Sequence, residues 1–459
     1  MPKRSLLALF LLVATGCGAS AVMEAADAGD MKAFRARLTE RLKEGEVDAD
    51  EARDIAGRIL GRQIEGAQGP VGRQELDSLE ECAPLVEASL SRRAAHNDEL
   101  GAVAALIRVH AGLVEPMTYA PQLSRSEPLW RAAAARSLTM PAPPAAEADG
   151  EEAARLLRAG TWRRQLMVDP FRDVRLAALQ AAVDAADPND GAAVLEAARL
   201  DPHPPVKLTA IEAAGAIGTR QTVLGLADLW PTAGEKARVA IVGAWARAAR
   251  KGQSVAGCAD LGRTHPHCLA WRQLVRASES DDGQAGLVAA LELIHDASPR
   301  GNSAAAQTAA AVVERLIDEA PTRIRVEAIA SAPLSWAHLL EAIVAAAESE
   351  DDAVVVAALG RMTELGGKER DQALTGLREI AKGDLPPADA ARQALVVARD
   401  GTVAPLLDQD ARAKSAQQRA QSAAGFAKLG KVDKALALLG DQDPRVRIRA
   451  ACAILGMED

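Results

Sequence analysis

The sequence LGDQDPRVRIRAACAILG, residues 439–456, combines an Asp-Pro pair, a Val-Arg pair and small residues at helical spacing. Asp443 can accept hydrogen bonds from the first backbone N–H groups of a helix, and the Pro that follows fits the first helical turn. Val446, Ala450 and Ala453 then form one narrow apolar stripe. Because so narrow a stripe cannot fold alone, the segment predicts a helix that packs against neighbours of its own kind.

The same pattern recurs along the chain. DPFRDVRLAALQAAVDA (residues 169–185) and DPHPPVKLTAIEAAGAIG (residues 201–218) align Val174 and Val206 with Val446, each followed by a basic residue and then by Ala four and seven positions later. Val174 and Val206 are 32 residues apart. Looser copies are centred on Ala237, Ile324, Val354 and Ala416. The sequence therefore predicts a repeat of about 31 residues in which each unit packs mainly on its neighbours.

Composition supports an all-helical chain. Aromatic residues make up only 2% of the 459 residues, whereas Ala is abundant, which favours thin helix-on-helix contacts over a thick core. The stretches between the copies, such as GAAVLEAARL (residues 191–200), have helical periodicity and predict a second helix in each unit. We expect an all-α fold of stacked antiparallel helix pairs.

The pattern D-P-x-V-R-x-x-A-A-x-A-I at residues 443–454 resembles the HEAT repeat, in particular the HEAT-like form of phycobilin lyases and of many bacterial scaffold proteins. The resemblance covers much of residues 126–459 and implies an α-α superhelix in which the second helix of each pair lines the concave face. It also suggests that Arg175, Lys207 and Arg447 pair with acids of adjoining units, although a solvated basic face is an equal alternative. These three residues are our candidates for contacts with a partner.

The first residues, MPKRSLLALFLLVATGCGAS, place two basic residues before a short apolar run that ends in small residues, as in a secretory signal. The stretch ATGC, ending at Cys17, resembles the lipobox of bacterial lipoproteins, which implies a lipid-modified Cys17. The alternative is a plain signal peptide. Gly18 stands where an inner-membrane retention signal often has Asp, so the resemblance favours the outer membrane, facing the periplasm.

These features predict a domain layout. We expect a signal peptide (residues 1–16), a tether after the lipidated Cys (17–24), an N-terminal helical region (25–139), a linker or loop rich in Pro, Ala and acids (140–152) and the repeat solenoid (153–459).

Two of the five cysteines, Cys258 and Cys268, are ten positions apart in GCADLGRTHPHC. In an oxidising compartment we expect them to form a disulfide. Together with His265 and His267 they could instead bind zinc, since all four are suitable ligands. We favour the disulfide and expect no metal.

Recognisable catalytic motifs are missing from the sequence. GFAKLGKV (residues 425–432) has the spacing of a phosphate-binding loop, but Val432 replaces the Ser or Thr that binds magnesium, and a helix end at Gly430 explains the stretch better. No G-x-S-x-G or H-E-x-x-H is present. We therefore expect neither a cofactor nor an enzyme, and the net charge of -9 disfavours nucleic acid as a partner.

The leading hypothesis is a non-catalytic scaffold, anchored by lipid to the bacterial cell envelope, that holds a protein or peptide partner along its concave surface. The alternatives are a small-ligand binder or enzyme that uses the groove, and a structural strut that associates with itself.

Overall fold

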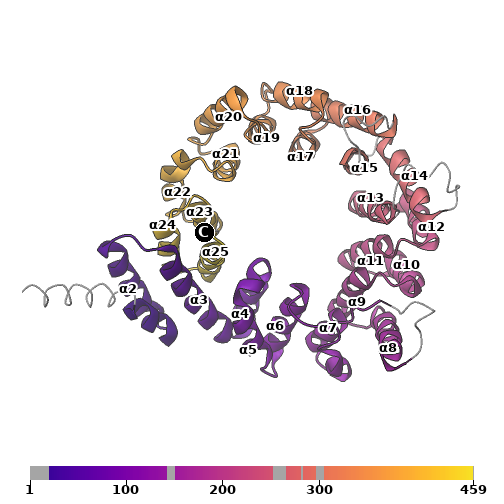
Figure 1. Cartoon of the computed structure of the whole chain (residues 1–459), viewed down its shortest axis with the longest axis horizontal. Helices are drawn as coiled ribbons and strands as arrows, with labels where there is room; N and C mark the ends of the chain where they lie inside the picture. The colour runs from indigo at the N-terminus through magenta and orange to yellow at the C-terminus, as the bar shows by residue number, and fades with distance from the viewer. Residues whose placement is uncertain (1–19, 142–149, 252–264, 281–282, 296–303, 458–459) are drawn as a thin grey trace, which may run out of the picture. The chain divides into compact units, whose positions relative to one another are not determined.

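The computed structural model describes residues 20–141, 150–251, 265–280, 283–295 and 304–457. Within these ranges the chain consists of helices and connecting turns, with no strand. The predicted all-α fold of stacked antiparallel helix pairs is confirmed (Figure 1). The expected signal peptide, Cys17, Cys258 and most of the expected linker at 140–152 lie outside the described residues.

The chain forms two compact units, which are described separately below. Unit 2 is the continuous segment 114–370, whereas unit 1 combines residues 1–113 with residues 371–459. This division does not coincide with the expected boundary at residues 140–152, and it separates the expected solenoid 153–459 into two parts. The units divide in this way because the N-terminal helices pack on the last repeats, and a local sequence pattern does not predict so distant a contact.

Unit 2 contains helices that alternate between two rows. They are η2 (Ala120–Ser124), α7 (Pro128–Arg136), α8 (Glu151–Leu166), α9 (Arg172–Ala185), η4 (Pro188–Asp190), α10 (Gly191–Leu200), α11 (Pro204–Ile217), α12 (Arg220–Leu229), η5 (Trp230–Thr232), α13 (Glu235–Arg250), α14 (Pro266–Ser278), α15 (Gly283–His295), α16 (Ala304–Glu319), α17 (Thr322–Ser331), α18 (Ala337–Ala346) and α19 (Asp352–Met362). α20 (Gly367–Ile380) contains the position at which the chain passes into unit 1.

The odd-numbered helices α7 to α19 of unit 2 form one row, here called the inner row, because each packs on the next and Figure 1 shows them on the inner side of the curve of this unit. The even-numbered helices α8 to α18 form the outer row. The anchor residues Val174 and Val206 are fully buried between the helices, together with the Ala residues four and seven positions later. The predicted apolar stripe is therefore the surface on which the repeats stack.

Close approach between inner-row helices depends on small residues. A Cβ atom added at Gly215 in α11 would lie only 2.4 Å from the Cα atom of Ala244 in α13. At Gly243, on another face of α13, an added Cβ would meet nothing within 4 Å. The helices of the row are thus in backbone contact where their residues are smallest, which explains the abundance of Ala.

Unit 1 contains helices from both segments of the chain. Residues 20–28 are helical, followed by α2 (Met31–Glu44), α3 (Ala49–Glu65), α4 (Gly69–Asp77), η1 (Glu80–Val86), α5 (Glu87–Ala94) and α6 (Glu99–His110). The C-terminal segment adds α21 (Pro386–Val397), η7 (Gly401–Val403), α22 (Ala404–Asp410), α23 (Ala416–Lys428), α24 (Val432–Ala437), η8 (Leu438–Gly440) and α25 (Pro444–Leu455). Val22 is fully buried, so packed structure begins within the segment expected to be a tether.

The two segments of unit 1 meet along a seam between α3 and α25. Arg35 donates from Nε to the backbone oxygen of Gly440 at 2.8 Å, and Arg53 donates to that of Met457 at 2.8 Å. A disulfide joins Cys82 to Cys452, 370 positions later. The N-terminal helices therefore cover the last repeat, where a further repeat would otherwise stack.

The expected helix starts at the Asp-Pro pairs are correct in one copy and wrong in two. Asp443 caps α25 by accepting a hydrogen bond from the backbone N–H of Arg445 at 2.9 Å, and Pro444 is the first helical residue. At Asp169 and Asp201, however, the helices begin three residues later, at Arg172 and Pro204. These two aspartates instead form ion pairs with arginines of the preceding repeats, as described below.

Among the described residues, no helix has both the length and the apolar character needed to cross a lipid bilayer.

Candidate protein-binding face

In several repeats an arginine near the start of the inner helix ties the repeat to the next one. In α9, Arg175 donates from Nε to Asp201 at 2.6 Å, and its Nη1 donates to the backbone oxygen of Asp169 at 2.9 Å. One guanidinium therefore closes the turn before its own helix and also binds the first carboxylate of the following repeat. We call this arrangement the arginine staple.

The arginine staple recurs in both units. In unit 2, Arg131 binds Asp169 and the backbone oxygens of Arg125 and Ser126. In unit 1, Arg419 binds Asp441 at 2.7 Å and the backbone oxygen of Ala413 at 3.0 Å. In these three repeats the backbone acceptors lie five and six positions before the arginine, so the staple has the same geometry each time.

Two of the staple aspartates, Asp201 and Asp441, are held in their charged form. Burial opposes charge on Asp201, but hydrogen bonds from Arg175 and from the backbone N–H of His203 keep the pKa of this carboxyl below its usual value. The pKa of Asp441 is likewise lowered, because its hydrogen bonds with Arg419 and the Asp443 backbone outweigh burial. These two staples are therefore ion pairs rather than neutral hydrogen bonds.

The three predicted contact residues behave differently. Arg175 is buried in its staple, and so it pairs with an acid of the adjoining repeat, one of the two alternatives that the sequence left open. Among the described residues, the one hydrogen-bond partner of the Lys207 side chain is the backbone oxygen of Arg199, at 3.2 Å. Their role in binding a partner stays a prediction, but for Arg175 a partner would have to displace a buried ion pair.

Arg447, in the last copy, forms half of a staple. Its Nη1 donates to the backbone oxygens of Asp441 and Gln442, both at 3.1 Å, while its Nε is buried without a partner. Burial lowers the pKa of this guanidinium, and the charge of Glu75 in α4 partly offsets that effect. The N-terminal helices therefore occupy the place of a next repeat without supplying its aspartate.

The exposed side of the inner row in unit 2 carries charges paired between helices of the row. Glu212 of α11 pairs with Arg247 of α13 at 2.8 Å, and Glu235 of α13 pairs with Arg323 of α17 at 2.5 Å. The exposed fractions of these four side chains lie between 43% and 64%. The same row contains the less exposed ion pairs Arg136–Asp184 and Arg250–Glu292, in which Arg136 is 12% and Glu292 25% exposed, and a hydrogen bond from Gln284 to Glu327. We call these five contacts the inner-row ladder.

Sequence reasoning missed this face because its residues lie outside the Val-Arg signature. A signal was present, however, in the acid six positions after Val206, namely Glu212, and in the basic residues near the end of α13. Pairs this exposed contribute little to stability, since water screens them. They are thus available to exchange their partners for those of another protein.

Only one cysteine of the predicted disulfide between Cys258 and Cys268 lies among the described residues. Cys268 is buried near the start of α14, while Cys258 lies outside the described residues, so the pairing stays a prediction. Nearby, the rings of His265 and His267 are 4.1 Å apart. Burial, and then the neighbouring His265, lower the pKa of His267. In the described part of the chain no group of three or more metal-ligating side chains comes together.

The stretch with phosphate-loop spacing ends a helix, as expected. α23 stops at Lys428 and Gly430 follows with a left-handed backbone, φ 67°. The N–H groups of Gly430 and Lys431 donate back to Ala427 and Phe426, at 3.0 and 2.8 Å. These two N–H groups cannot bind a phosphate, because both already donate to backbone oxygens of α23.

Comparison with known proteins finds likeness in structure alone. No protein-family model matches this chain, and no curated protein sequence matches it. An engineered protein of solved structure is 16% identical, with a TM-score of 0.29 over 91% of this chain and 97% of that one.

Solved structures of Kap121p are also similar to this chain. The one bound to RanGTP has a TM-score of 0.32 and 11% identity over 90% of this chain and 49% of that one. The one bound to the extreme C-terminus of the phosphatase Cdc14p has a TM-score of 0.27 and 12% identity over 99% of this chain and 53% of that one. The present chain spans about half the length of these Kap121p chains.

Proposed function

We propose that this protein is a non-catalytic scaffold that binds a protein or peptide along the inner row of unit 2 and is anchored by lipid at Cys17 to the bacterial cell envelope. The observation that supports binding is the inner-row ladder, in which Glu212–Arg247 and Glu235–Arg323 are the most exposed ion pairs. A long face of paired charges suits an extended protein surface better than a small molecule.

The repeat separates stability from recognition. Stacking uses the buried anchor residues, and the staples lie at the turns that precede the inner-row helices. The exposed ladder takes part in neither. Its residues can therefore serve a partner at small cost to the fold, as expected for a repeat scaffold.

Charge reversal on the ladder tests the binding face. The change is Arg247→Glu with Arg323→Glu, whose side chains are 43% and 64% exposed. The matched control is Arg155→Glu with Arg199→Glu on the outer row, each 46% exposed and each paired with an acid. Both double variants change the net charge equally and should melt within a few degrees of the wild type.

The assay has two steps. A photo-crosslinking residue at Glu212 captures the partner in intact cells, and the same residue at Asp228 in α12 serves as the outer-row control. The purified partner is then titrated against the variants. We expect the inner-row variant to lose at least about tenfold in affinity and the outer-row variant less than twofold.

Two results would refute the proposal. Equal loss in both variants would show that the inner row is not the face, and recovery of only this chain would favour a self-associating strut. The anchor is tested by labelling with an alkyne fatty acid: label that persists in Cys17→Ser would refute lipidation at that position.

A further inference from the structure

Unit 1 contains a basic cavity of about 850 Å³ beside the carboxyl ends of α21, α23 and α25. Arg399, Lys428 and Lys431 line it, together with small and apolar residues that include Ala453 and Met457. Among the described residues that line it there is no Asp or Glu. The cavity is therefore lined by positive charge, whereas the chain as a whole has a net charge of -9.

Basic residues at helix ends often serve to satisfy the last carbonyl groups. Lys251 does so in unit 2, where its Nζ donates to the backbone oxygen of Ile217 at 3.1 Å. In the part of the chain that the structure describes, Lys428 and Lys431 form no side-chain hydrogen bond or ion pair. The backbone caps this end of α23 by itself, so the two ammonium groups are not needed for the helix.

Arg399 occupies a backbone position that favours glycine. Its φ is 57°, close to the 67° of Gly430 in the following repeat. The hydrogen bonds also match: Arg399 donates to Val396, three positions back, as Gly430 does to Ala427. A left-handed backbone is strained for arginine and free for glycine, so the turn itself does not require arginine at this position.

We propose that this cavity binds an acidic segment of the protein partner, whose Asp or Glu carboxylates pair with Arg399, Lys428 and Lys431. The inference rests on the proposed function, because it names the chemistry of that partner. A peptide is favoured over a nucleotide, since the backbone N–H groups of Gly430 and Lys431 are already bonded within the chain. Recognition is thus left to flexible side chains on an open surface, which suits carboxylates spaced along an extended chain.

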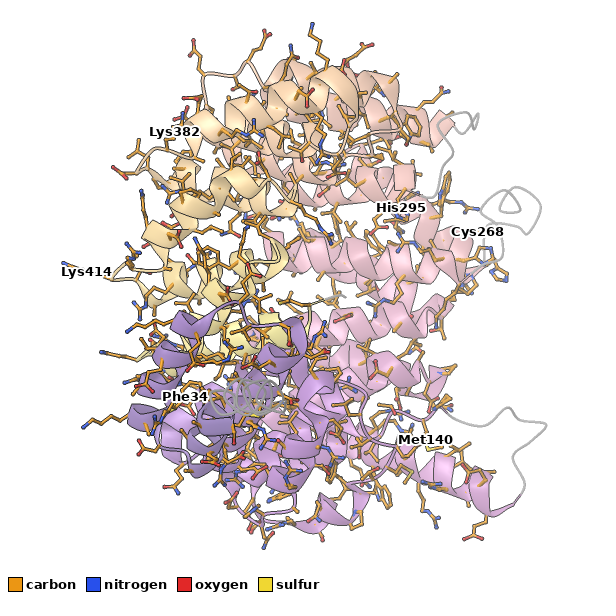
Figure 2. All side chains as sticks on the ribbon, turned by 60° about the vertical axis from the view of Figure 1, so that its left-hand side comes forward. Phe34, Met140, Cys268, His295, Lys382 and Lys414 are labelled. Atoms are coloured by element: carbon orange, nitrogen blue, oxygen red, sulfur yellow. A yellow bond between two sulfur atoms is a disulfide. The ribbon has the colours of Figure 1, made fainter. Side chains whose placement is uncertain are left out.

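The probe is a fluorescent decapeptide of glutamate, titrated by anisotropy at low salt against the full chain. The pocket variant is Lys428→Glu with Lys431→Glu. The matched control is Lys382→Glu with Lys414→Glu, two exposed lysines of the same unit that Figure 2 shows projecting from the C-terminal segment. We expect the pocket variant to bind at least about tenfold more weakly and the control less than twofold.

Arg399→Gly separates binding from folding. Glycine relieves the strained backbone and offsets the loss of the interaction that Arg399 makes within the chain, so the melting temperature should change little, while the affinity for the peptide falls. A variant that melts earlier and binds normally would show that the arginine serves the turn alone. Equal loss in the pocket and control variants, or equal binding of a glutamine decapeptide, would overturn the proposal.

Further outcomes identify the kind of ligand and show whether this inference or the proposed function is wrong. Competition by millimolar inorganic phosphate that matches the peptide would point to a small anion and contradict the peptide assignment. If the wild type captures a partner through the inner row but ignores the glutamate peptide, this inference fails and the proposed function stands. If the peptide binds the pocket but no partner is captured, the proposed function fails instead.

Discussion

Arg163 of α8 allows the sharpest test of how unit 2 is held together. Its side chain is fully buried, with Nε 2.5 Å from Asp190 and Nη2 3.0 Å from Asp187, both of which are buried as well. Its Nη1 donates to the backbone oxygens of Leu138 and Met140, at 2.8 and 2.9 Å. One guanidinium thus joins α8 to the turn before it and to the turn after α9.

Replacing Arg163 by Met keeps the volume and removes the charge. Asp187 then loses its ion pair, two backbone carbonyls lose their donor, and Asp190 keeps only Arg164, at 2.9 Å. Removing one partner of a buried ion pair costs about 3–5 kcal/mol, and we expect a loss in that range. The control, Arg155→Met, affects an exposed residue of the same helix whose acid lies 3.7 Å away, and should cost less than about 1 kcal/mol.

The pH dependence adds an independent check. Burial raises the pKa of Asp190, although Arg163 opposes that rise. Without Arg163 the pKa should rise further, so the folded state should take up a proton more readily than the unfolded chain. The stability deficit of Arg163→Met should then shrink as the pH falls from 7 towards 5. The assay is urea unfolding followed by circular dichroism at several pH values. A deficit below about 1 kcal/mol, or one that does not change with pH, would refute the account of a buried charge cluster.

Three further predictions concern other contacts. Gly215→Ala should destabilise unit 2 by about 1–3 kcal/mol, because its Cβ would overlap the backbone of α13. Gly243→Ala, whose Cβ would meet open space, should be neutral or stabilising. Equal melting temperatures of the two variants would contradict this prediction. Because the pKa of Asp201 is lowered, its ion pair should stabilise the fold above about pH 4, and this stabilisation should be lost as the pH falls through the pKa of the folded state. In Asp201→Asn the free energy of unfolding should therefore depend less on pH in the acid range. An unchanged pH dependence would count against the ion pair. Reducing the bond between Cys82 and Cys452, which closes a loop of 370 positions, should remove up to about 5 kcal/mol and speed hydrogen exchange in α3; exchange that stays the same would show that the seam holds without it.

The fold could be predicted because its signal is local and repeated. Val174, Val206 and Val446 recur with Ala at helical spacing, and all three are fully buried where neighbouring helices stack. The role of each aspartate follows its distance from the anchor rather than the Asp-Pro pair itself: Asp443 lies three positions before Val446, whereas Asp201 lies five positions before Val206. Asp443 caps, whereas Asp201 receives the staple of the preceding repeat.

Features that join distant parts of the chain were not predictable in this way. The bond between Cys82 and Cys452 requires that the N-terminal helices meet the last repeat, and no spacing or motif carries that information. The inner-row ladder also depends on which face of each helix is left exposed once stacking is complete. The pairing of Arg175 with an acid of the next repeat was one of the two alternatives that the resemblance to the HEAT repeat left open.

The composition of unit 1 from both segments has a consequence for the growing polypeptide. Chains are synthesised at about 5–20 residues per second, so α25 emerges roughly 20–70 s after the helices that will cover it. During that interval the surface of α3 that later packs on α25 has no cover. A chaperone that binds apolar helix faces would therefore meet this surface early, and it would have to release it before Cys82 could reach its partner.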